Sequence, residues 1–113
     1  MKEIFVRLRV PGFHYWEGAP IARGYLGERH RHLFHLVVSM PVGHADREVE
    51  FHDLLDEVRE LFPVNTEHNG KSCEMMAEEI GRTLADRYKR AVTVEVSEDG
   101  EVGGRVVIDE YND

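Results

Sequence analysis

Two histidines one residue apart, His30 and His32, and a third upstream, His14, are the residues of this chain best spaced for metal chemistry. Strand side chains alternate between two faces, so His30 and His32 would point the same way on a strand. A third imidazole from a neighbouring strand would complete three nitrogen ligands, the set that a catalytic zinc ion uses while one position stays open. The sequence therefore predicts a zinc site at His14, His30 and His32. A surface His-x-His pair is also common by chance.

The pattern of apolar residues places these histidines on two strands. Residues 4–10 alternate apolar and polar side chains, which predicts a half-buried strand. Pro11 and Gly12 are expected to interrupt it as a bulge or bend, with residues 13–16 continuing on a shifted face. A second strand is predicted over residues 30–42, where both histidines share a face with four apolar residues: Phe34, Leu36, Val38 and Met40.

Two helices and two more strands follow. Residues 51–62 repeat apolar side chains at helical spacing, and Pro63 ends that helix. Ser72 is expected to cap a second helix that reaches residue 88, in which Gly81 indicates a close packing contact. Strands near residues 92–96 and 106–108 would be joined by a turn at Asp99-Gly100.

The element order predicts the fold class. The order ββααββ indicates one α+β domain over residues 1–113, with a four-stranded antiparallel sheet and both helices on one face. The other face of this sheet would either be solvated or line an oligomer.

Composition excludes several classes of partner. Acidic residues outnumber basic ones 22 to 14, for a net charge of -8, which argues against nucleic acid and anionic membranes. No apolar run is long enough to span a bilayer, and a single cysteine cannot form an internal disulfide. We therefore expect a soluble, cytoplasmic protein.

Five short motifs, in order along the chain, resemble the 6-pyruvoyltetrahydropterin and 6-carboxytetrahydropterin synthase family. In that family a first zinc histidine ends the first strand, and a His-Gly-His follows on the second. An Asp-Phe-x-x-Leu and a Thr-Ser-Glu open the two helices, and a glutamate ends the third strand. The corresponding segments here are Phe13-His14, His30-Arg31-His32, Glu50-Phe51-His52-Asp53-Leu54, Ser72-Cys73-Glu74 and Val94-Glu95-Val96-Ser97-Glu98.

The resemblance implies a fold and an assembly. It implies the tunnelling fold across essentially the whole chain, with protomers assembled into trimers or hexamers that form a barrel and with pockets at subunit junctions. It also implies zinc at the three histidines and a pterin-like or purine-like ligand. Glu98 would then anchor the ring by accepting hydrogen bonds from its amidine-like edge, assisted by Glu74 at a helix N-terminus.

The acid–base residues depart from the family pattern. The family places a catalytic cysteine about four residues before its His-Gly-His, or in a second branch a glutamate three residues before it. Here no cysteine stands in that segment, and Glu28 lies two residues before His30. The family's Asp-His pair between the helices is also missing, and the short segment there offers only Glu67 and His68. Glu28, His68 and Cys73 are the candidate proton-transfer residues.

Three functions stay open on the sequence. The first is a zinc-dependent carbon–oxygen lyase of the pterin synthase type, acting on a dihydroneopterin derivative in pterin or 7-deazaguanine (queuosine) biosynthesis. The second is a non-catalytic or re-purposed relative that binds a pterin-like or purine-like heterocycle. The third is a structural ββααββ domain whose histidines are coincidental.

Overall fold

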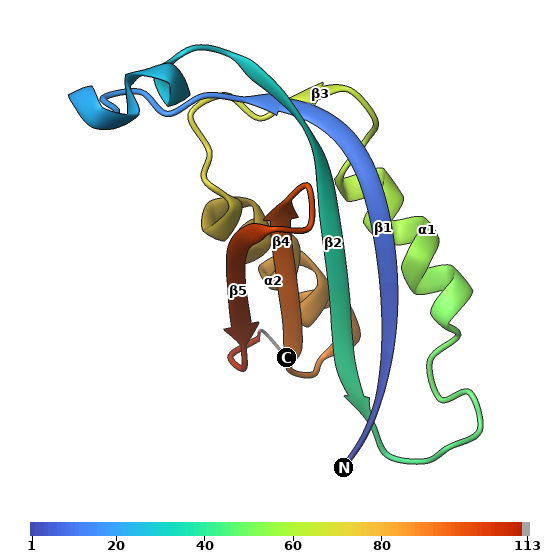
Figure 1. Cartoon of the computed structure of the whole chain (residues 1–113). Coiled ribbons are helices and arrows are strands. Elements are labelled where there is room, and N and C mark those ends of the chain that lie inside the picture. Colours follow the sequence, from blue (N-terminus) through green and yellow to red (C-terminus); the bar gives the residue numbers. More distant parts are fainter. Residues whose placement is uncertain (112–113) are drawn as a thin grey trace.

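Two long strands, β1 (Lys2–His14) and β2 (His30–Val42), form an antiparallel ribbon that carries the three candidate zinc ligands (Figure 1). The computed structural model describes residues 1–111. Pairing of the two strands keeps one register from Lys2 opposite Val42 to His14 opposite His30. The short 3₁₀ segment η1 (Ile21–Gly27) lies in the connection between them, at the end of the ribbon.

The predicted bulge at Pro11 and Gly12 is wrong. Both residues pair in the unbroken register of β1, and the strand continues to His14 on its original face. Proline is tolerated because β1 is nearly an edge strand and little ladder bonding is lost. Glycine serves packing rather than bending, since a Cβ at Gly12 would lie 3.2 Å from the rings of His68 and Phe34.

The sheet has five strands in the order β3-β1-β2-β4-β5, one more than predicted. The extra strand, β3 (Thr66–Glu67), pairs in parallel with Gly12 and Phe13 of β1. A two-residue strand has no periodicity to read, which is why the apolar pattern missed it. The strands β4 (Val92–Glu98) and β5 (Val102–Ile108) are antiparallel to their neighbours, as predicted.

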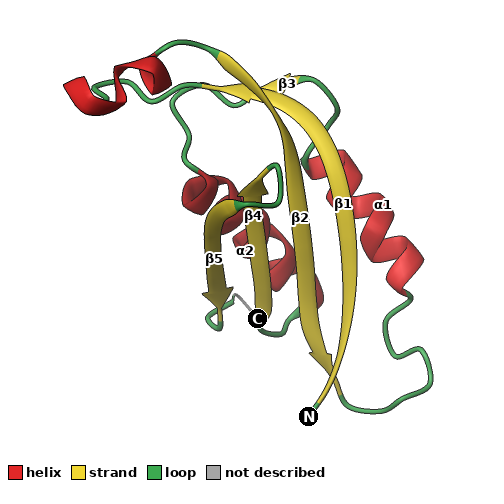
Figure 2. Ribbon diagram, viewed as in Figure 1, coloured by secondary structure: helices red, strands yellow, loops and turns green. Residues whose placement is uncertain are grey.

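Both helices pack on one face of the sheet (Figure 2). Helix α1 (Phe51–Leu61) contacts β1 and ends before Pro63, whereas α2 (Cys73–Tyr88) packs on β4 and β5. Ser72 caps α2 by accepting a hydrogen bond from the backbone N–H of Met75. The order and layers of the elements confirm the α+β prediction.

The core lies between this face of the sheet and the helices. The inward residues of the strands are buried as the alternation predicted, and the helices contribute their apolar stripes. The largest fully buried side chains are Phe34, Leu36, Met40, Leu54, Met76 and Leu84. Within residues 1–111, no helix is both long and apolar enough to cross a bilayer.

Candidate metal centre

Three strands bring His14, His30, His32 and Glu98 together at one end of the sheet. His14 on β1 lies directly opposite His30 on β2, and His32 follows on the same face. Glu98 ends β4 opposite Phe34, the next inward residue of β2. One potential ligand atom from each of the four side chains lies within 4.8 Å of all the others. His14 lies next to His30 and His32 because the register of β1 is unbroken through Pro11 and Gly12.

Each imidazole is oriented by a hydrogen bond from its Nδ1 atom. Nδ1 of His14 lies 3.0 Å from the carbonyl oxygen of Lys71, and Nδ1 of His30 lies 2.8 Å from that of Glu28. Nδ1 of His32 lies 2.8 Å from Oδ2 of Asp99. Carbonyl and carboxylate oxygens only accept, so each Nδ1 carries the hydrogen. The neutral rings therefore present the lone pairs of their Nε2 atoms to the centre.

The three Nε2 atoms are buried without a hydrogen-bond partner. Oε1 of Glu98 lies 3.0 Å from Nε2 of His14, and Oε2 lies 3.4 Å from Nε2 of His32, but neither contact has hydrogen-bond alignment. Lone pairs that converge on a carboxylate repel each other unless a cation lies between them. Imidazoles whose other nitrogen donates to a carbonyl or carboxylate are typical metal ligands. The donor set therefore fits a zinc ion.

Burial favours the metal-binding form of His14. The residue is 6% exposed, and desolvation lowers its pKa, although the bond to Lys71 and the charge of Glu98 act in the opposite direction. A histidine binds a metal only when its imidazole is neutral. At neutral pH, His14 is therefore in the protonation state that a metal site requires.

A cavity of about 480 Å³ opens beside this cluster. His14, His30 and Glu98 form one of its walls. The rest of the lining comes from the segment before η1 and from η1 itself, from the loop before α2 and its first turn, and from the start of β5. These residues are Tyr15, Trp16, Leu26, Gly70, Lys71, Ser72, Cys73, Glu74, Met75, Val102 and Gly103. A planar, polar ligand would find flat side chains, carboxylates and backbone donors here.

No family model matches this chain, and no curated protein matches its sequence. Solved structures do match its fold. The 6-pyruvoyltetrahydropterin synthase of Plasmodium vivax superposes with a TM-score of 0.69 at 12% identity, over 96% of this chain and 98% of that one. A P. vivax variant with its catalytic glutamate replaced by cysteine gives a TM-score of 0.73, and the Plasmodium falciparum synthase gives 0.68, each with the same identity and coverage.

The chain has the fold of the 6-pyruvoyltetrahydropterin synthases. This likeness confirms the fold that the sequence resemblance implied.

Cys73 and Glu74, which the sequence also predicted as site residues, line the cavity at the start of α2. Cys73 is 5% exposed, and burial raises the pKa of its thiol to about 12, with the charges of Glu98 and Glu74 acting in the same direction. At neutral pH, Cys73 is therefore a protonated thiol, which can hold a proton but cannot act as a base.

The other two proton-transfer candidates lie outside this cavity. Glu28 is exposed, and its backbone carbonyl, rather than its carboxylate, contacts His30. His68 is buried behind Phe34, where its ring stacks on Phe62 at 4.2 Å between centroids. Burial lowers the pKa of His68, and its Nε2 atom has no hydrogen-bond partner. It lines a separate cavity of about 260 Å³ with Lys71 and Glu79.

Sequence reasoning missed all three groups that orient the histidines, namely the Asp99 carboxylate and the backbone carbonyls of Lys71 and Glu28. Asp99 was interpreted only as part of a turn, yet its carboxylate accepts from both His32 and the backbone N–H of Leu33. The two carbonyls have no sequence signal at all, because any residue supplies a carbonyl. The Asp99 role could have been suspected, since metal-bound histidines commonly need a carboxylate acceptor behind them.

Proposed function

We propose that this chain is a zinc-dependent pterin enzyme of the 6-carboxytetrahydropterin or 6-pyruvoyltetrahydropterin synthase type. It would act as a carbon–oxygen lyase on a dihydroneopterin-type substrate, in the formation of pterins or 7-deazaguanine bases. The observation that carries the proposal is the convergence of three unpartnered Nε2 atoms whose rings are each held by an acceptor at Nδ1. The shared fold supports the same substrate class.

Zinc would be held by His14, His30 and His32. When bound, it would supply a Lewis acid that polarises a hydroxyl or carbonyl oxygen of the substrate side chain. The hydrogen bonds to Lys71, Glu28 and Asp99 keep the three rings in the tautomer that binds a metal.

The cavity would hold the heterocycle. Glu98 is the proposed anchor, because a carboxylate can accept two hydrogen bonds from the amidine-like edge of a pterin or purine. Glu74 would assist from the N-terminal turn of α2, and Trp16 and Tyr15 would stack against the ring. Glu98 also lies among the four possible metal-binding side chains. The zinc content of the Glu98→Gln variant separates the role of ring anchor from that of metal ligand. If Glu98 is the anchor, the variant keeps its zinc and loses affinity for the heterocycle.

Proton transfer is assigned to Glu28, His68 or Cys73. The P. vivax enzyme has a catalytic glutamate, which supports Glu28 as its counterpart here. Cys73 is the candidate closest to the proposed ligand, and as a protonated thiol it would serve as a proton donor. His68 would need a path past Phe34. To rank the three candidates by their contribution to proton transfer, turnover rates on one substrate are compared for Glu28→Gln, His68→Gln and Cys73→Ala.

Metal analysis of the purified protein is the first test. We expect one zinc per chain in the wild type, and loss of that zinc in His14→Ala, His30→Ala or His32→Ala. His52→Ala is the matched control, because His52 is exposed on α1 and outside the cluster. Wild-type protein that binds no zinc from a buffered solution would make the proposal wrong.

Turnover of dihydroneopterin triphosphate is the second test. We expect lyase products from the wild type and a strong loss of rate in Glu28→Gln. An alternative function, binding without catalysis, is favoured by the exposed position of Glu28 and the high pKa of Cys73. That alternative would be favoured if the wild type bound the ligand without turning it over and if Glu98→Ala abolished the binding.

A further inference from the structure

The outer face of the sheet, opposite the helices, carries arginines in neighbouring positions of β1 and β2. The register places Arg7 opposite Val37, Arg9 opposite His35, and Arg31 opposite Phe13. These odd-numbered positions point away from the core, which is filled by the even-numbered residues of both strands.

These arginines lack the partners that most other arginines have. Seven arginines form ion pairs with carboxylates: Arg29, Arg47, Arg59, Arg82, Arg87, Arg90 and Arg105. Across residues 1–111, no carboxylate pairs with Arg7, Arg9 or Arg31. A shortage of carboxylates is not the cause, because the chain has 22 acidic and 14 basic residues.

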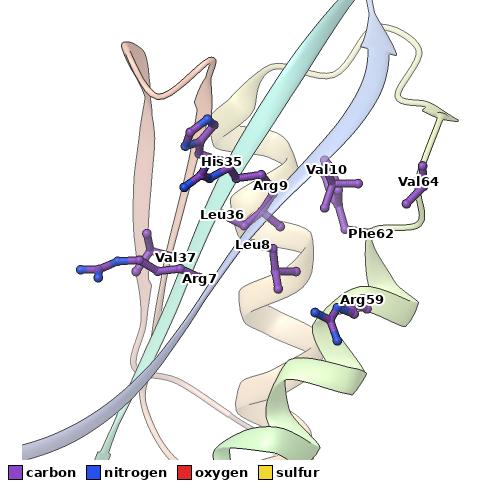
Figure 3. Close-up of a pocket in the computed structure, with 10 residues that line it drawn as sticks. All are labelled: Arg7, Leu8, Arg9, Val10, His35, Leu36, Val37, Arg59, Phe62 and Val64. Atoms are coloured by element: carbon purple, nitrogen blue, oxygen red, sulfur yellow. The ribbon is translucent and has the colours of Figure 1, made fainter.

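Arg7, Arg9 and His35 lie together on one side of a cavity of about 480 Å³ that extends around β1 and is also lined by Arg59, Phe62 and Val64. Figure 3 shows Arg9 beside His35 with Arg7 farther along β1. The guanidinium of Arg7 lies over the ring of Phe5, 4.6 Å from its centroid. The ring of His35 packs against the turn at Gly100. Arg9 and His35 lie directly opposite each other on β1 and β2, so N–H groups of both side chains can donate to one anion between them.

We propose that this face binds a small anion that bears two or three linked phosphate groups, through Arg7, Arg9 and His35. A guanidinium presents two parallel N–H groups that match two phosphate oxygens. Residues two apart on a strand are separated by about 7 Å, so both guanidinium groups can reach neighbouring phosphates. A long polynucleotide fits less well, because the net charge of -8 repels its flanking phosphates. The site lies across the sheet from the histidine cluster and is independent of the function proposed above.

Calorimetric titration with inorganic tripolyphosphate at low salt tests this site. The double variant Arg7→Gln/Arg9→Gln is compared with Arg82→Gln/Arg87→Gln, which removes the same charge from exposed positions of α2. We expect the first pair to weaken binding about tenfold or more and the second to change it less than about twofold, since each lost contact is charge-assisted. All four arginines are exposed, so both double variants are expected to fold.

Three results would overturn the proposal. The first is absence of tripolyphosphate binding by the wild type. The second is equal weakening in both double variants, which would indicate a general charge effect or binding at the histidine cluster. The third is tighter binding of a single-stranded oligonucleotide than of tripolyphosphate, which would assign the face to nucleic acid.

Discussion

Asp99, a turn residue, holds the imidazole of His32 in place. Its Oδ2 accepts from Nδ1 of His32 at 2.8 Å, and its Oδ1 accepts from the backbone N–H of Leu33 at 2.9 Å. These bonds lower the pKa of Asp99, that from Leu33 most, so the carboxylate is charged throughout the neutral range. A charged acceptor makes the His32 ring a better metal ligand.

Replacing Asp99 by asparagine is therefore expected to weaken zinc binding by about 10- to 100-fold. Asparagine tolerates the positive φ of 56° at this position, so the turn is kept while the charge is lost. Competition with a chromophoric chelator measures the affinity. Glu101→Gln, in the same hairpin, is the matched control. Equal affinities of the two variants would show that Asp99 does not support the site.

Cys73 is expected to resist alkylation in the folded protein. With a pKa raised to about 12 by burial, almost none of its thiol is ionised at pH 8. We predict that iodoacetamide modifies it about 100-fold or more slowly than in guanidinium-unfolded protein, as followed by mass spectrometry. Comparable rates would mean that the thiol is accessible and ionised, and would favour Cys73 as a base rather than a proton donor.

The connection from β3 to α2 links the sheet to the ring of His14. The backbone N–H of His68 donates to the carbonyl of Phe13, and that of Lys71 donates to the carbonyl of His68. The carbonyl of Lys71 then accepts from Nδ1 of His14. Gly70, with a φ of 68°, lets the chain turn between them. This segment therefore sets the orientation of the His14 imidazole, one of the candidate metal ligands.

Protonation of His68 is expected to destabilise this connection. Its folded-state pKa lies below the ordinary value of 6.5, so the unfolded chain binds more protons as the pH falls below about 6.5. The contribution of neutral His68 to the free energy of unfolding is thus fully present above that pH. It is lost as the pH falls toward the lower folded-state pKa. We predict that His68→Gln flattens the fall of the melting temperature between pH 7 and pH 5, measured with EDTA present.

His44→Gln is the control for that experiment, because His44 is exposed. It should leave the pH dependence close to that of the wild type. If His68→Gln and His44→Gln gave the same profile, the acid sensitivity would arise from other groups, such as the buried His14.

Gly81 lets α2 approach β5. A Cβ there would lie 2.8 Å from Cγ1 of Ile108, which confirms the close contact expected from the sequence. We predict that Gly81→Ala lowers the free energy of unfolding by about 1–3 kcal/mol in urea titrations, since overpacking outweighs the better helix propensity of alanine. The loss should shrink when Ile108 is also changed to alanine. An unchanged loss in that background would rule out the steric cause.

For the whole molecule, we predict self-association as a homotrimer or homohexamer. η1 has no buried residue, and its Ile21 and Tyr25 are 102% and 66% exposed. β1 also offers a largely free edge, because β3 pairs only with Gly12 and Phe13. Light scattering after size exclusion measures the mass. The double change Ile21→Glu/Tyr25→Glu should dissociate the assembly, and a monomeric wild type would contradict the prediction.

The sequence by itself determined the two helices, the four longer strands and which of their side chains face the core. Alternation along residues 4–10 and 30–42, and helical spacing in 51–62 and 73–88, are local periodicities that burial imposes directly. The Ser72 cap and the Asp99-Gly100 turn are equally local, because each depends on the backbone of a few neighbouring residues. The placement of His30 and His32 on one strand face followed from the same rule.

Only the tertiary structure decided how the site is assembled. Strand β1 continues without a break through Pro11 and Gly12, and this register places His14 opposite His30. His68 is buried behind Phe34. The tertiary structure also paired His14 with Lys71, 57 positions away, and His32 with Asp99, 67 positions away. Such pairs leave no periodic trace in the sequence, because they depend on strand register and on how loops pack. Residue types thus determined which ligands were available, and packing decided their orientation.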